Sequence, residues 1–95
     1  PQTPAVNNLL SCQPNPFRAS TRICWDQKEA SPAKIAVYNV RGQLVKRFEP
    51  KYAERGEQSL VWNGDDERGR QVSPGIYFIR LLSGPRVQTG KVLRW

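Results

Sequence analysis

Short segments in which hydrophobic and polar residues alternate predict strands along most of the chain. In residues 21–26 (TRICWD), Ile23 and Trp25 share one face, and in residues 34–40 (KIAVYNV) Ile35 and Val37 do the same. A period of two is the pattern of a half-buried strand. Together with residues 9–12, 43–48, 59–62, 75–83 and 86–94, these segments predict seven short strands.

Pairs that contain glycine or proline separate the predicted strands. Arg41-Gly42 and Gly84-Pro85 are typical of hairpin turns, Asn63-Gly64 favours a left-handed backbone, and Pro74-Gly75 carries the residues of a type II turn. Residues 49–56 form a polar connection, and no segment of helical length stands out. The sequence therefore predicts an all-β fold, a seven-stranded antiparallel immunoglobulin-like β-sandwich. The expected core contains Leu9, Ile23, Trp25, Ile35, Val37, Leu44, Leu60, Trp62, Ile76, Phe78, Leu81 and Val92.

The chain is predicted to be one domain that follows a short linker. Its 95 residues are enough for one hydrophobic core. Residues 1–8 (PQTPAVNN) are polar and proline-rich, so we expect a linker from an upstream region and a domain over residues 9–95. Because the sequence begins at Pro1 without Met, we expect an excised or processed part of a longer chain. No stretch approaches the roughly 20 apolar residues of a membrane span.

The chain is strongly basic, with 15 Lys and Arg against 8 Asp and Glu and a formal net charge of +7. Such a balance can attract nucleic acid, anionic lipid or acidic polysaccharide. The longest basic cluster is only the pair Lys46-Arg47, and the other basic residues are scattered. We therefore expect solvated strand faces and loops, and no nucleic-acid partner.

Two cysteines, Cys12 and Cys24, flank a predicted turn. A hairpin there could bring them together in a disulfide, which would imply an oxidising compartment. The alternative is two free thiols, with one packed as a small hydrophobic residue. Two cysteines without any His are too few for the usual zinc site, so the sequence predicts no metal and no cofactor.

The sequence shows no arrangement that suits catalysis. Nucleophilic catalysis needs a base beside a Ser or Cys, and His, the commonest base, is absent. The one acidic cluster is Asp65-Asp66-Glu67, and neighbouring residues of one loop do not naturally flank a glycosidic bond. We therefore expect a non-enzymatic protein.

The acidic loop also invites comparison with a calcium loop. Asn63, Asp65 and Glu67 occupy the first alternating positions of such a loop, but Gly69 falls one place late. The twelfth position is Pro74, where a bidentate Glu is required. The sequence predicts a loop whose Asp side chains accept hydrogen bonds from its own backbone amides.

Four stretches, in order, resemble a known family. Asn15-Pro16-Phe17, followed by Thr21 and Ile23, resembles the NPF-x-x-x-T-x-I opening of the C-terminal sorting domains of type IX (Por) secretion, and residues 35–45, with Gly42, resemble their core hairpin. Residues 62–77 are similar to the pattern W-D-G-x-D-x-x-G-x-x-V-x-x-G-x-Y of the FlgD-like immunoglobulin domain of flagellar hook-capping proteins. The matching residues are Trp62, Gly64, Asp66, Gly69, Gly75 and Tyr77. The ending resembles the terminal strand of the sorting signal through Gly90, Lys91, Val92, Leu93 and Arg94.

The resemblance implies a C-terminal domain that directs an upstream cargo domain of the same chain through type IX secretion. The implied partner is the outer-membrane translocation machinery, and the implied location is the cell surface or the medium, with the periplasm in transit. The backbone edge and positive charge of the last strand would form the recognition element.

Two other classes of function remain open. One is a FlgD-like structural or adhesive module that bridges protein partners. The other is an accessory carbohydrate-binding domain of a glycoside hydrolase, in which the aromatic residues would stack on sugars. Their spread over different strands favours a place in the core over a sugar-stacking platform.

Overall fold

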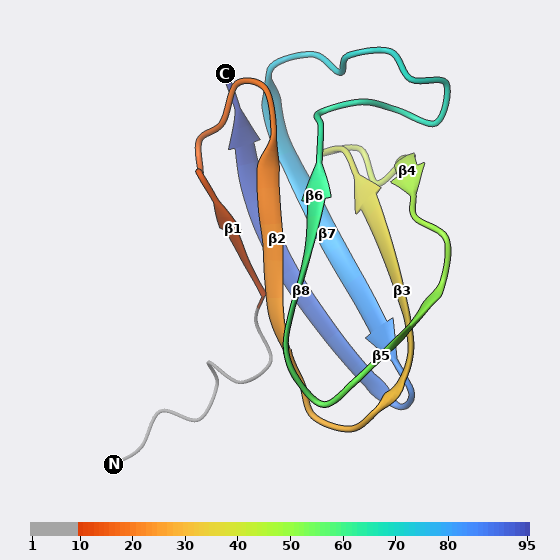
Figure 1. Ribbon diagram of the computed structural model, residues 1–95. Helices are drawn as coiled ribbons and strands as arrows, with labels where there is room; N and C mark the ends of the chain where they lie inside the picture. The colour runs from red at the N-terminus through yellow and green to blue at the C-terminus, as the bar shows by residue number, and fades with distance from the viewer. Residues whose placement is uncertain (1–9) are drawn as a thin grey trace.

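Two antiparallel sheets pack face to face in the computed structural model, which describes residues 10–95 (Figure 1). The first sheet has the order β1-β2-β6 and contains β1 (Ser11–Gln13), β2 (Thr21–Gln27) and β6 (Gly56–Trp62). The second has the order β4-β3-β7-β8, with β5 also paired to β3. Its strands are β3 (Ser31–Tyr38), β4 (Leu44–Arg47), β5 (Lys51–Ala53), β7 (Gly75–Ser83) and β8 (Arg86–Arg94). The predicted all-β sandwich is confirmed, with eight strands in place of seven.

The predicted linker of residues 1–8 and the predicted core residue Leu9 lie outside the described residues. Within residues 10–95 there is no helix long and apolar enough to cross a membrane. The additional strand is β5, which lies in the segment expected to be a polar connection. Three residues are too few to show an alternating pattern, and only Ala53 of this strand is buried.

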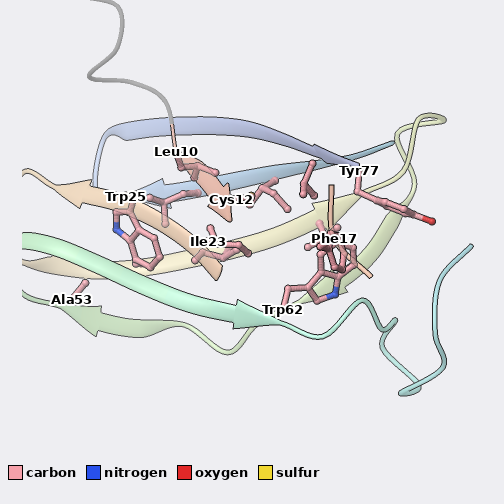
Figure 2. Close-up of a cluster of buried hydrophobic side chains, with 14 residues drawn as sticks. Leu10, Cys12, Phe17, Ile23, Trp25, Ala53, Trp62 and Tyr77 are labelled. Carbon is pink, nitrogen blue, oxygen red and sulfur yellow. The ribbon is translucent and has the colours of Figure 1, made fainter. Parts of the chain in front are cut away.

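The core lies between the sheets and is filled mainly by alternate residues of β2, β3 and β7 (Figure 2). Seven of the expected core residues are buried: Ile23, Trp25, Ile35, Val37, Trp62, Leu81 and Val92. Leu60 is partly buried and packs against this cluster. The alternation in β2 and β3 was therefore sufficient to predict which face each strand buries.

Two of the three core residues expected on β7 were wrong. Ile76 and Phe78 are 40% and 41% exposed, whereas Tyr77 and Ile79 point into the core with Leu81. The sequence IYFIRLL has apolar residues on both faces, so its hydrophobic pattern does not fix the register. Leu44 is also exposed, at the β-bulge between β3 and β4. The core instead gains seven residues that the sequence did not predict: Leu10, Cys12, Phe17, Ala33, Ala53, Tyr77 and Ile79.

A buried polar cluster ties the two sheets together at the end where β2 leads into β3. Gln27 accepts a hydrogen bond from the indole nitrogen of Trp25 at 2.9 Å. Its amide nitrogen lies 2.6 Å from the hydroxyl of Ser83 and 3.1 Å from that of Ser31. Because every polar atom of Gln27 has a partner, its burial does not leave an unsatisfied amide.

The two cysteines are free. β1 and β2 are paired, but Cys12 lies opposite Ile23 and faces the core, whereas Cys24 lies one position further on and faces away from it. Burial raises the pKa of the Cys12 thiol to about 11, with a smaller contribution from Cys24. The disulfide that the spacing left open is not formed, because the pleat directs the two side chains to opposite faces.

Candidate functional site

The family-like motifs meet at one end of the sandwich. Figure 1 shows the β1–β2 connection, the long β6–β7 loop and the end of β8 together at this end. Phe17 of the β1–β2 connection, Trp62 at the end of β6 and Tyr77 near the start of β7 are buried side by side at this end (Figure 2). The rings of Phe17 and Trp62 are 5.4 Å apart and tilted by 56°, and those of Trp62 and Tyr77 are 5.5 Å apart at 70°. These tilted and edge-to-face arrangements are the favourable ones for aromatic rings.

Asn15 fastens the first motif to the last strand. Its side-chain oxygen accepts a hydrogen bond from the backbone amide of Leu93 at 2.9 Å, and its side-chain nitrogen donates to the carbonyl of Lys91 at 3.1 Å. Next to it, the amide of Phe17 donates to the carbonyl of Leu93, and the amide of Trp95 donates to the carbonyl of Phe17. The segment Asn15-Pro16-Phe17 thus lies along β8 and forms a parallel bridge to Arg94.

These contacts occupy the outer edge of β8. Besides Lys91 and Leu93, the carbonyl of Thr89 accepts a hydrogen bond from the amide of Leu10 at 3.2 Å. A Cβ atom on Gly90 would lie 2.5 Å from the side chain of Leu10, so glycine permits this close approach. The expectation that the backbone edge of the last strand is free for a partner is therefore wrong. The side chains of Lys91 and Leu93 remain exposed on the face of the sheet.

Arg94 anchors the β6–β7 loop to the same end. Its two terminal guanidinium nitrogens donate to the carbonyl of Val72 at 2.9 Å and to the side-chain oxygen of Gln71 at 2.7 Å. Gly64 lies beneath the guanidinium with a φ of +68°. A Cβ atom there would lie 2.8 Å from Nε of Arg94 and 3.3 Å from the Phe17 ring. Glycine is required at position 64 both for its backbone conformation and for this packing.

The predicted loop, whose Asp side chains accept hydrogen bonds from its own amides, is confirmed at Asp66 but not at Asp65. The Asp66 carboxylate accepts hydrogen bonds from the amides of Arg68 and Arg70, each at 2.9 Å. The bond from Arg70 is the main cause that lowers the pKa of Asp66 below its ordinary value. Asp65 pairs instead with Lys46 of β4 at 2.8 Å, and Glu67 accepts a hydrogen bond from the amide of Arg47. The three neighbouring carboxylates are therefore directed to three different partners.

The remaining motif residues shape turns. Gly69 and Gly42 have φ values of +81° and +80°, the latter in the β3–β4 hairpin. Gly75 opens β7 with a φ of +149°, far from the value near +80° of the expected type II turn. The hydroxyl of Tyr77 donates to the carbonyl of Ser73, and burial raises the pKa of this phenol. Tyr77 thus holds the approach to β7 in place.

Trp95 is an exposed aromatic residue beside this junction. It is 56% exposed, and the guanidinium of Arg18 lies 5.7 Å from the centre of its ring. This separation is within the range of a cation–π contact. No sequence pattern connects Arg18 with Trp95, because their proximity depends on the pairing of residues 15–17 with β8.

The fold of this chain is similar to that of domains in known proteins. The solved structures that share the fold include the following three, and the chain spans less than two thirds of each. FlgD from P. aeruginosa is 21% identical, with a TM-score of 0.68, over 78% of this chain and 61% of its own. Dimeric latent PorU from Porphyromonas gingivalis is 18% identical, with a TM-score of 0.67, over 90% of this chain and 9% of its own.

The third structure is PorZ from Porphyromonas gingivalis, an essential bacterial surface component of the type-IX secretion system. It is 15% identical, with a TM-score of 0.62, over 90% of this chain and 11% of its own. No curated protein matches the chain. The family model of the FlgD Ig-like domain matches residues 15–83, which includes the first motif and the whole β6–β7 loop. The chain belongs to the FlgD Ig-like domain family.

Proposed function

We propose that this domain is a non-catalytic C-terminal sorting and anchoring domain. It directs a cargo, upstream in the same chain, through type IX secretion to the cell surface, and its partner is the outer-membrane translocation machinery. The likeness of fold to PorU and PorZ supports this reading at the level of architecture. The sorting-domain motifs themselves, at residues 15–17 and 90–94, support the function more specifically.

The observation that carries the proposal is the bridge from Asn15 to the last strand. The opening and closing motifs of the sorting resemblance are separated by more than 70 residues, yet they bind each other directly. This pairing presents the end of the chain as a fixed structure, with Lys91, Leu93 and Trp95 exposed. A receptor would therefore meet ordered side chains, and less conformational entropy would be lost on binding.

We expect the receptor to contact exposed side chains of β8, because pairing with the backbone edge of this strand is blocked. On the edge of β8 that faces away from β7, the carbonyls of Thr89, Lys91 and Leu93 and the amide of Leu93 already have partners within the domain. A receptor strand would have to displace the segment 15–17 before it could pair with β8. Lys91 and Leu93 instead project outward as a basic and an apolar contact, which suits a receptor groove of complementary charge.

Substitutions of exposed residues test the proposal without unfolding the domain. Deletion of residues 91–95 would also remove the fully buried Val92 and the anchor Arg94, so it cannot separate sorting from folding. The better variant carries Lys91→Glu and Leu93→Ser. Its matched control is Arg22→Glu, an exposed change on the first sheet.

The measurement is the surface exposure of a reporter that has a signal peptide and ends in this chain, in a bacterium with type IX secretion. The wild-type and Arg22→Glu fusions are expected at the surface, where added protease cleaves them. The double variant is expected to stay in the periplasm while its circular dichroism remains that of a folded sheet protein. Periplasmic retention of the wild-type fusion would overturn the proposal.

The FlgD-like structural module is the second candidate, and its support is the family itself. It predicts that the chain bridges protein partners in an extracellular assembly, and that the reporter stays in the periplasm in the same assay. The carbohydrate-binding alternative receives less support from the geometry. Trp25, Trp62 and Tyr77 are buried in the core, where they cannot stack on a sugar.

A further inference from the structure

The two sheets differ sharply in charge. The five strands of the second sheet contain no acidic residue, because all 8 Asp and Glu lie in the first sheet or in connecting segments. The same five strands contain eight basic residues: Lys34, Lys46, Arg47, Lys51, Arg80, Arg86, Lys91 and Arg94. The basic residues are scattered along the sequence, but the fold concentrates more than half of them in one layer.

The outer face of β3, β7 and β8, which points away from the first sheet, combines this charge with apolar side chains. Its exposed apolar residues are Ile76, Phe78, Leu82, Val87 and Leu93. Its basic residues are Lys34, Arg80 and Lys91, all exposed. The register places Phe78 between Tyr38 and Lys91, and Leu82 between Lys34 and Val87. Basic side chains are therefore interspersed among the apolar ones on neighbouring strands.

Within residues 10–95, the basic side chains of this face form no ion pair and its apolar side chains remain exposed. Among residues 10–95, none of the three basic residues lies within ion-pair distance of a carboxylate. Five large apolar side chains are each more than a third exposed: Ile76, Phe78 and Leu93 adjoin near one end of the face, and Leu82 and Val87 pair on the other side of Arg80 and Thr89. Exposed apolar surface of this kind is typical of a binding site on a soluble domain.

We propose that this outer face docks the acidic surface of another protein, whose apolar side chains cover the row from Ile76 to Leu82. The positive charge of this face favours an acidic partner over a second copy of the same face. A second copy of the same face would bring Lys34, Arg80 and Lys91 against one another, at a cost in repulsion. An acidic partner would instead neutralise all three while the apolar rows pack together.

The arrangement of the side chains disfavours the other anionic occupants. On a membrane surface, apolar side chains enter the lipid while basic ones remain at the boundary with the headgroups. Arg80 lies between Phe78 and Leu82 along β7, so insertion of those two would also draw a charged guanidinium inward. Nucleic acid would neutralise the basic residues but would leave the apolar row without a partner, because its backbone is polar and charged.

The inference goes beyond the proposed sorting function and does not depend on it. The required chemistry is an acidic surface with apolar side chains, whichever protein carries it. The positions changed in its test, Lys34, Phe78 and Arg80, lie on β3 and β7, whereas the sorting test changes Lys91 and Leu93 of β8. Loss of docking and loss of export can therefore be measured separately.

Site-specific photo-crosslinking in the cells that make the protein tests the proposal. The probe is p-benzoylphenylalanine in place of Phe78, at the centre of the face. The expected product is a covalent adduct with one protein, identified by mass spectrometry, whose contacting surface is acidic. The adduct should be lost in the variant that also carries Lys34→Glu and Arg80→Glu. It should persist with Arg22→Glu and Arg55→Glu, which change the net charge equally at exposed positions elsewhere.

Circular dichroism and urea unfolding of both charge variants establish that each remains folded. An adduct with lipid, nucleic acid or a second copy of the chain would overturn the proposal. So would an adduct with a protein that persists after reversal of Lys34 and Arg80, or the absence of any adduct in folded protein.

Discussion

Asn15 holds Leu93, 78 positions further along the chain, through a hydrogen bond of 2.9 Å from the backbone amide to the side-chain oxygen. The side-chain nitrogen of the same residue donates to the carbonyl of Lys91. An amide side chain can accept and donate at once, which neither an aspartate nor a lysine can do. Asn15 therefore closes the seam between the β1–β2 connection and β8.

Replacement of Asn15 should destabilise the contact between the β1–β2 connection and β8. Asn15→Ala removes two hydrogen bonds at a partly solvated site, so we expect a loss of about 1–2 kcal/mol in the free energy of unfolding. Urea denaturation followed by tryptophan fluorescence measures it. Asn63→Ala is the matched control, since the Asn63 side chain is exposed and makes no hydrogen bond within residues 10–95. Equal losses in the two variants would contradict the role of Asn15.

A comparison of two glycines with similar φ values distinguishes the cost of backbone strain from the cost of lost packing. Gly64 and Gly42 have φ values of +68° and +80°, so alanine is strained at both by about 1–2 kcal/mol. Only at position 64 does the new Cβ meet other atoms, 2.8 Å from Arg94 and 3.3 Å from Phe17. We expect Gly64→Ala to lower the urea midpoint clearly more than Gly42→Ala does. If the two variants unfold at the same urea concentration, Arg94 does not pack as described.

The face that β7 buries can be tested with two isoleucines. Ile79→Ala creates a cavity in the core and should destabilise the domain by about 2–5 kcal/mol. Ile76→Ala removes a side chain that is 40% exposed and should cost less than about 1 kcal/mol. Thermal and urea unfolding measure both. The reverse order would mean that β7 presents its other face to the core.

Asp66 should make the stability of the domain depend on pH in the acid range. Its pKa in the folded protein lies below the ordinary value of 3.8, chiefly because the amide of Arg70 donates to it. A lowered pKa contributes stability that is fully present above the unfolded pKa and is lost as pH falls through the folded pKa. We expect the difference in unfolding free energy between wild type and Asp66→Asn to shrink below about pH 4. An unchanged difference between pH 7 and pH 3 would contradict this.

The two cysteines should react very differently. Cys12 is buried and its pKa is raised to about 11, so almost no thiolate is present at neutral pH. Cys24 faces away from the core and is partly exposed. Iodoacetamide at neutral pH should therefore label only Cys24 in the folded protein, as peptide mass spectrometry can show. Labelling of both, or a disulfide between them, would be inconsistent with this arrangement.

Much of the fold could be predicted from the sequence because most strands are bounded by clear turn residues. The bounds predicted for β7 and β8 match the structure, as does the buried face of β2 and β3. Segments without an alternating pattern were not predictable in the same way. β7 is apolar on both faces, and β5 is too short to show a period.

The candidate site could also be predicted only in part. The motif residues Trp62, Gly64 and Tyr77 could be identified from spacing, but their convergence with Phe17 depends on tertiary pairing. The sequence does not show that the outer edge of β8 is covered. That covering depends on the side-chain amide of Asn15 and on the parallel bridge between Phe17 and Arg94. The basic outer face of the second sheet could not be predicted either, because its basic residues become neighbours only when the strands pair.

The most direct test of the sorting function is the location of a cargo with and without the domain. A reporter with a signal peptide is made in a type IX-secreting bacterium, once ending in the full chain and once without it, and the fraction cleaved by external protease is measured. The sorting function predicts surface exposure only for the reporter that ends in the chain. Equal exposure of the two reporters, or periplasmic retention of both, would contradict it.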